Sequence, residues 1–170
     1  VSTDGSTGGM ELAGPKTSYV VGTPQSRKYY VYLPNSVALS PDGNRAYLTG
    51  YMCHFRKSHF PPHRSWYHLV NVVDLQTGKI TRFAGTVEAQ ANREPANNTQ
   101  FRCPMSVACD AKGRVYVADN FNNRIQVYQP DGTYFRSIPV KRPGIVRVNP
   151  KNGDIYVRSS DLAIVGGHEG

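Results

Sequence analysis

The hydrophobic pattern is clearest between Phe101 and Ile138, where short apolar runs alternate with turn-forming residues. Residues 106–109 and 115–118 flank the polar sequence Asp-Ala-Lys-Gly, and residues 125–128 and 134–138 flank Pro-Asp-Gly. Short β-branched and aromatic runs bounded by glycine, proline and aspartate are typical of antiparallel hairpins. The segment therefore predicts four short antiparallel strands joined by tight turns.

A similar pattern occurs three times along the chain. The sequences PNSVALSPDGNRAYL from Pro34, PMSVACDAKGRVYV from Pro104 and PGIVRVNPKNGDIYV from Pro143 align from their first proline to a shared tyrosine. Pro104 and Pro143 lie 39 residues apart, and repeats of roughly 40 residues that each form a four-stranded sheet are the signature of β-propeller blades. The chain is therefore predicted to be all-β, built of propeller blades of four antiparallel strands.

The alignment also predicts how the chain is divided. We expect a flexible arm or linker at 1–17, the outer strands of a preceding blade at 18–33, blade one at 34–83 with a top-face insertion at 50–66, a long crossover loop at 84–102, blade two at 103–140 and an incomplete blade three at 141–170. About three blades are too few to close a ring, because closed propellers need at least about four. The expected partners are further blades, from the same full-length chain or from another copy, that pair with the open edge strands. Of the two sources, the longer chain is favoured.

The residues that carry the repeat resemble a known family. The run from Phe83-Ala-Gly-Thr through Pro95-Ala96 to Pro104-x-Ser-Val-Ala-x-Asp-x-x-Gly-x-Val-Tyr-Val-Ala-Asp-x-x-Asn-x-Arg-Ile-Gln-Val-Tyr128 is similar to the NHL repeats of β-propellers. Residues 39–48 and 73–79 are equally similar to the YVTN type of bacterial extracellular propeller. The resemblance covers about residues 33–165 and implies fold more than activity, since this architecture hosts lactonases, lyases, RNA-binding proteins and inert scaffolds.

The insertion at 50–66 and the residues just after it contain four of the five histidines of the chain. Imidazole and thiolate are good ligands for zinc or copper. The metal candidates are His54, His59, His63 and His68, with zinc, copper or calcium as the ion. No C-x2-C or H-E-x-x-H spacing is present, and Pro61-Pro62 opposes a helix that would align two histidines. We therefore expect a basic surface loop without a cofactor, with metal binding as the alternative.

The three cysteines have different expected environments. Cys109 aligns with Leu39 and Val148, so it is expected to face a neighbouring blade as a small buried hydrophobic residue. Cys53 and Cys103 fall on loops of adjacent blades at the top face, and a disulfide between them would fasten the insertion to the scaffold. The sequence leaves this disulfide and a pair of free thiols as equal alternatives.

The basic charge of the chain has two interpretations, a solvated surface or a binding surface for an anionic partner. The formal net charge is +8, and no apolar run approaches the length of about 18 residues that a membrane helix needs. Cations and aromatic rings alternate in the insertion, and the binding candidates are Phe55, Arg56, Lys57, Arg64, Trp66 and Tyr67. Single-stranded RNA would use such residues for phosphates and bases, and an anionic glycan or an acidic protein would suit the same surface. A solvated basic surface is the simpler interpretation.

Two single positions carry further expectations. Arg147 aligns with the small residues Ala38 and Ala108, so its guanidinium should find a carboxylate or a carbonyl partner, because burying it unpaired would be costly. Asn97 begins the acceptor sequence Asn-Asn-Thr, which would be glycosylated only on an exposed loop of an exported protein. Together with the resemblance and the disulfide, it favours an extracellular or periplasmic location.

The motifs of catalysis are largely missing from the sequence. The 12 acidic residues and the histidines form no Ser-His-Asp order, paired carboxylates or phosphate loop. We therefore expect a non-catalytic binding or scaffold module that presents a loop-built surface to a protein or glycan. The alternatives are a metal-assisted hydrolase or lyase that uses the histidine-rich loop, and a module that binds single-stranded RNA.

Overall fold

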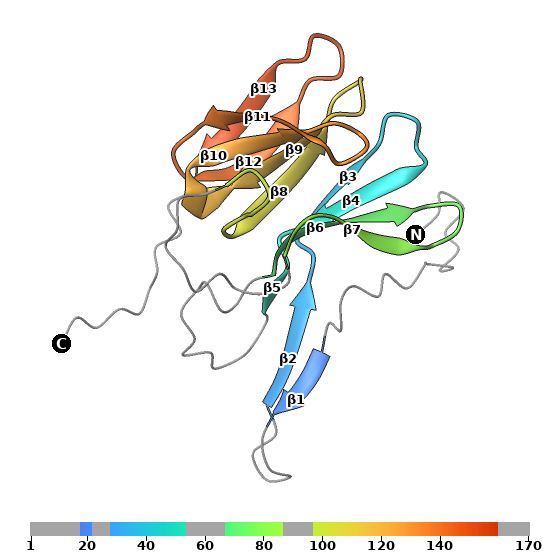
Figure 1. Ribbon diagram of the computed structural model, residues 1–170, viewed down its shortest axis with the longest axis vertical. Helices are drawn as coiled ribbons and strands as arrows, with labels where there is room; N and C mark the ends of the chain where they lie inside the picture. Colours follow the sequence, from blue (N-terminus) through green and yellow to red (C-terminus); the bar gives the residue numbers. More distant parts are fainter. Residues whose placement is uncertain (1–17, 22–27, 54–66, 87–96, 160–170) are drawn as a thin grey trace, which may run out of the picture.

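The computed structural model describes residues 18–21, 28–53, 67–86 and 97–159 (Figure 1). Within these ranges the regular structure is β-strand, apart from the short 3-10 helix η2 (Asn120–Asn122). The prediction of an all-β chain made of antiparallel propeller blades is confirmed. In the same ranges, no helix has the length and apolarity needed to cross a membrane.

Two four-stranded antiparallel sheets form the centre of the structure, and in each the strands follow one another in sequence order. Blade one consists of β3 (Ser36–Leu39), β4 (Arg45–Thr49), β6 (His68–Asp74) and β7 (Ile80–Thr86). Blade two consists of β8 (Pro104–Cys109), β9 (Val115–Asp119), β10 (Arg124–Tyr128) and β11 (Tyr134–Pro139). The four strands expected between Phe101 and Ile138 are thus the four strands of blade two.

Two smaller sheets lie beside these blades. The strands β12 (Pro143–Val148) and β13 (Ile155–Ser159) pair with each other in blade three. The remaining sheet has the order β1-β2-β5, with β1 (Ser18–Val21), β2 (Lys28–Leu33) and β5 (Met52–Cys53). The pairing of β2 with β5 was not expected from the sequence, and the sheets do not close into a ring.

The strand register reproduces the sequence alignment in all three blades. The shared tyrosine of each repeat pairs with the aligned residue of the innermost strand: Ala38 with Tyr47, Ala108 with Tyr116, and Arg147 with Tyr156. The guanidinium of Arg147 donates to the carbonyl oxygen of Val146 at 2.7 Å and lies 3.3 Å from the hydroxyl of Ser106. The expected carbonyl partner of Arg147 is confirmed.

The buried apolar residues of the described ranges form three clusters, one within blade one around Leu48 and Leu69 and two layers between the blades. Tyr47 and Val70 of blade one pack against Val107 and Val117 of blade two, and a second layer joins blades two and three around Ala118, Ile125 and Val146. Cys109 contributes to the first layer as predicted, and burial raises the pKa of its thiol to about 12. Such layers stabilise the stack by roughly 25 cal/mol for each Å² of apolar surface buried.

Equivalent apolar residues are exposed at the two ends of this stack. Val37 and Leu39 are each 59% exposed, although their counterparts in blade two, Val107 and Cys109, pack against blade one. Tyr156 is 60% exposed, whereas Tyr47 and Tyr116 are buried at 1% and 2%. Each end therefore presents the kind of surface that the inner blades bury against a neighbour.

Candidate functional site

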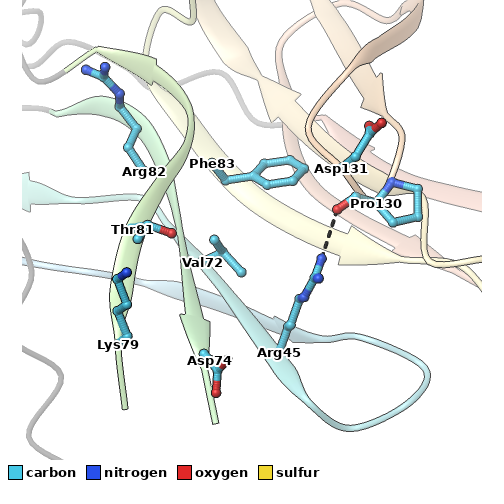
Figure 2. A pocket seen from close by; sticks show the side chains of 9 residues that line it. All are labelled: Arg45, Val72, Asp74, Lys79, Thr81, Arg82, Phe83, Pro130 and Asp131. Carbon is cyan, nitrogen blue, oxygen red and sulfur yellow. Dashed lines mark hydrogen bonds between the residues drawn. The ribbon is translucent and has the colours of Figure 1, made fainter. Parts of the chain in front are cut away.

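A pocket of about 430 Å³ opens between the outer part of blade one and the β10–β11 turn of blade two (Figure 2). Strands β4, β6 and β7 and the β6–β7 turn supply one wall, and the β10–β11 turn supplies the other. The lining residues are Arg45, Val72, Asp74, Lys79, Thr81, Arg82, Phe83, Pro130 and Asp131. Three cations and two carboxylates therefore surround a space large enough for a small ligand.

The three cations differ in how strongly the protein already holds them. Arg45 extends across the pocket, where its Nη1 atom donates a 3.1 Å hydrogen bond to the carbonyl oxygen of Pro130 (Figure 2). Lys79 and Arg82 form no side-chain hydrogen bond or ion pair with any residue of the described ranges. Both can therefore pair with a bound anion without first breaking a contact to this part of the chain.

Both carboxylates of the pocket are held by the turns that carry them. Asp74 accepts hydrogen bonds from the amides of Gln76 and Thr77, each 2.9 Å long, and the bond from Thr77 lowers the pKa of Asp74 most strongly. Asp131 accepts one from the amide of Thr133 at 2.9 Å, which lowers its pKa in the same way. The carboxylates remain ionised, but these amides satisfy part of their hydrogen-bonding capacity, which leaves the cations more available to a ligand.

Phe83 provides the aromatic surface of the pocket, which Val72 and Pro130 also line with apolar groups. Its half-buried ring packs edge to face against Tyr47 at 5.0 Å and Tyr128 at 5.9 Å, between ring centroids. The side chain is therefore fixed by both blades. An apolar ring face beside free cations suits a ligand that has a hydrophobic surface and a negative charge.

The sequence did not identify this pocket, although strand alternation contains a signal for it. Side chains two residues apart lie on the same face of a strand, and Thr81 and Phe83 of β7 both line the pocket. Arg82 lies between them and lines it too, where the pairing of β7 with β6 is irregular. The contribution of the distant β10–β11 turn has no such local signal, because it depends on how the blades stack.

Of the predicted metal ligands, only His68 lies in the described part of the chain. It is buried on β6, where its Nδ1 atom accepts a 3.0 Å hydrogen bond from the amide of Cys103. The side chain thus ties blade one to the start of blade two. No group of three histidine, cysteine or acidic side chains suited to a metal occurs among the described residues, and His54, His59 and His63 lie outside them.

The aromatic and basic candidates of the insertion are placed only in part. Tyr67 is half-buried and packs against the core of blade one, with its ring 6.5 Å from that of Tyr51, so it belongs to the scaffold more than to an exposed binding face. Phe55, Arg56, Lys57, Arg64 and Trp66 lie outside the described residues.

The cysteine and asparagine candidates have distinct environments. Cys103 is fully buried, and burial raises the pKa of its thiol. The Cys53 side chain lies outside the described residues, so the disulfide between Cys53 and Cys103, one of two equal alternatives, stays a prediction. Asn97 is exposed, and its Oδ1 atom accepts hydrogen bonds from the amide and hydroxyl of Thr99, both 3.0 Å long. The glycosylation of Asn97 stays a prediction.

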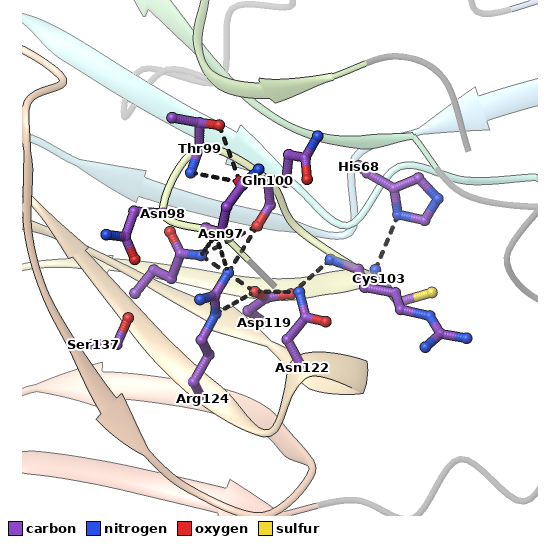
Figure 3. Close-up of polar contacts among 12 residues, drawn as sticks. His68, Asn97, Asn98, Thr99, Gln100, Cys103, Asp119, Asn122, Arg124 and Ser137 are labelled. Atoms are coloured by element: carbon purple, nitrogen blue, oxygen red, sulfur yellow. Dashed lines mark hydrogen bonds and ion pairs between the residues drawn. The ribbon is translucent and has the colours of Figure 1, made fainter. Parts of the chain in front are cut away.

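A buried ion pair positions the loop that leads into blade two (Figure 3). Asp119 is fully buried, its Oδ2 atom lies 2.8 Å from Nε of Arg124, and its Oδ1 atom accepts a 2.6 Å hydrogen bond from the amide of Arg102. Arg124 also donates to the carbonyl oxygens of Asn97 at 2.7 Å and Gln100 at 2.9 Å. Burial raises the pKa of Asp119, and its hydrogen bonds oppose that rise. The pair therefore holds the end of the crossover loop on the scaffold.

Comparisons with known proteins agree with this architecture. Residues 101–128 match the model of the NHL repeat. The structure resembles hydrazine synthase from Kuenenia stuttgartiensis, with 22% identity and a TM-score of 0.50 over 84% of this chain and 33% of that one. No match was found among curated proteins.

Two further solved structures show the same likeness. One is a gluconolactonase from Xanthomonas campestris, with 13% identity and a TM-score of 0.51 over 81% of this chain and 44% of that one. The other is a luciferin-regenerating enzyme, with 17% identity and a TM-score of 0.51 over 88% of this chain and 46% of that one. The chain spans less than half the length of each of the three structures, and at these identities the likeness concerns the propeller fold.

Proposed function

Because residues 101–128 are an NHL repeat within a stack of propeller blades, we propose that the protein is a non-catalytic binding module whose inter-blade pocket binds an acidic glycan. The observation that carries the proposal is the combination of Lys79 and Arg82 with the ring of Phe83 in one pocket. The cations pair with the carboxylate or sulfate of the sugar, and the ring packs against its apolar face.

The energetics favour a charged sugar over a neutral one. Hydrogen bonds to charged groups contribute roughly 1.5–3 kcal/mol each, about twice the value of neutral ones. The bound anion would also offset the mutual repulsion of Arg45, Lys79 and Arg82. An extracellular or periplasmic location is part of this proposal, since acidic polysaccharides are found there and the exposed Asn97 would be accessible to glycosylation.

Isothermal titration calorimetry with an oligogalacturonate tests the proposal, using its methyl-esterified form as the neutral probe. We expect saturable binding of the acidic form only, weakened about tenfold or more by Lys79→Glu and Arg82→Glu. Lys151→Glu makes the same charge change at an exposed position outside the pocket, in the β12–β13 turn, and should bind like the wild type. Equal binding of the two probes, or equal loss in Lys151→Glu, would reject the proposal.

Two alternatives predict different results in the same preparation. A metal-assisted hydrolase or lyase that uses His54, His59 and His63 would carry close to one zinc, copper or calcium ion per chain in elemental analysis. A module for single-stranded RNA would retain an oligonucleotide on a filter with steep salt dependence and would bind it more tightly than the acidic glycan.

The scaffold part of the proposal concerns the two ends of the stack. Val37, Leu39 and Tyr156 are exposed, whereas the equivalent residues between neighbouring blades are packed. This supports a role for the three residues as contact surfaces for further blades of the same kind. Covering them would extend the stack toward the four to eight blades of a typical closed propeller.

A further inference from the structure

A second basic cluster lies at the opposite end of β10 from the pocket. Phe121, in η2, has the guanidinium carbon of Arg142 at 4.4 Å from its ring centroid and that of Arg102 at 5.6 Å. Cation–π contacts at these distances hold both side chains against one ring. Two positive charges are therefore gathered at the junction of blades two and three.

Arg142 has an unsatisfied polar atom at this junction. Its Nη1 atom is buried and has no hydrogen-bond partner, although the same group packs against Phe121. A buried donor without an acceptor is costly, and a charged donor is more costly still. The atom therefore points to an acceptor that the described part of the protein does not supply.

The backbone holds Arg142 in this position at some cost. Its φ angle is +45°, in the left-handed region that residues other than glycine rarely adopt. The conformation is supported by a 3.1 Å hydrogen bond from the amide of Arg142 to Oδ1 of Asn123, a residue that is itself left-handed at +53°. Strained conformations of this kind gather at ligand-binding sites.

The available carboxylate does not neutralise the cluster. Asp119 is occupied by Arg124, Asn122 and the amide of Arg102. Among the described residues, neither Arg102 nor Arg142 forms an ion pair. The two guanidinium groups therefore carry a net charge of two that no side chain of the described ranges balances.

We propose that Arg102, Phe121 and Arg142 form a binding site for a phosphate group. A phosphate dianion matches the two positive charges and offers acceptors to both guanidinium groups, because Arg102 is exposed and Arg142 is only half-buried. Phe121 orients both side chains without competing for the anion. The site is separate from the inter-blade pocket and does not depend on the function proposed for it.

Phosphate titration followed by NMR of the full chain tests this site, with chloride at matched ionic strength as the reference. We expect saturable shifts at Phe121 and Arg142, with affinity reduced about tenfold or more in both Arg102→Met and Arg142→Met. Arg102 is exposed, so its variant keeps the test informative if the Arg142 variant does not fold. Arg136→Met is the matched control, because Arg136 also lies over a ring, that of Phe135, at 5.8 Å.

Three results would overturn the proposal: shifts no larger than those with chloride, equal loss of affinity in the Arg136 control, or acetate binding as tightly as phosphate. The Lys79→Glu variant separates this site from the pocket. It should bind phosphate like the wild type even where it no longer binds an acidic glycan.

Discussion

The hydroxyl of Ser36 accepts a 3.1 Å hydrogen bond from the backbone amide of Val107, and so joins the innermost strands of blades one and two. The same contact occurs one blade further on, where the hydroxyl of Ser106 accepts from the amide of Val146 at 3.3 Å. Ser36 and Ser106 occupy the same position of the sequence repeat. The hydrogen bond is therefore a repeated connection between blades, and blade three has Ile145 at the corresponding position.

Replacing these serines tests how much the connection contributes. Ser36→Ala and Ser106→Ala each leave an amide without its acceptor, so we expect a loss of about 1–3 kcal/mol in the free energy of unfolding. Thr81→Ala removes an exposed hydroxyl from β7 and should cost less. Urea denaturation gives the comparison, and equal losses in all three variants would show that the hydroxyls do not connect the blades.

Gly85 should tolerate no side chain. A Cβ atom there would lie 2.2 Å from the carbonyl oxygen of His68 and 2.6 Å from the ring of Phe101, and the φ angle is +84°. Gly85→Ala is expected to cost about 3 kcal/mol or more, from overpacking and the left-handed backbone together. Gly153→Ala is the control, since its φ is +78° but no atom lies within 4 Å of the new Cβ. Thermal unfolding should show a much smaller loss for the control.

The sequence predicted the blades well because their signals are local. The shared prolines and tyrosines gave the register that Tyr47, Tyr116 and Tyr156 show in the structure, and the small residue expected at Cys109 is packed between blades. Strand β2 comes just before the β3–β4 hairpin of blade one and β5 comes just after it, and the two strands pair with each other. Nothing in either short sequence specifies this partner.

The inter-blade pocket was not predicted from the sequence, for a physical reason. Clustering of histidines in sequence suggested a shared site, yet His68 faces inward because it occupies a buried position of β6. The pocket instead joins Lys79 and Phe83 to a turn about 50 residues away. In the sequence, Asp119 and Arg124 were recognised only as part of the NHL-like motif. Their role in holding the crossover loop is seen only in the structure, where they form an ion pair.

The Asp119–Arg124 pair should be essential for the order of the crossover loop. Arg124→Met removes the partner of a fully buried carboxylate, and breaking such a pair costs about 3–5 kcal/mol. It also removes the donors to the carbonyl oxygens of Asn97 and Gln100. We expect lower stability together with faster hydrogen exchange at the amide of Arg102. Arg136→Met, at an exposed position of β11, should change neither quantity.

Asp110 should make the stability of blade two depend on pH. Burial alone would raise the pKa of Asp110, but hydrogen bonds from the side chain and amide of Arg114 and from the hydroxyl of Tyr116 outweigh it, so the pKa is lowered. A lowered pKa means that the folded state favours the ionised carboxylate. The stabilisation is therefore present above the usual aspartate pKa of about 3.9 and is lost as the pH falls through the folded value.

Asp110→Asn isolates this contribution. At neutral pH the variant should be less stable than the wild type by about 1–3 kcal/mol, because the charged acceptor is lost. The difference should narrow as the pH falls below the usual aspartate range, since the wild-type carboxyl then becomes neutral as well. Urea midpoints between about pH 7 and pH 2.5 measure it, with Asp154→Asn as an exposed control. A difference that stays constant or widens in acid would show that the charge of Asp110 does not stabilise the blade.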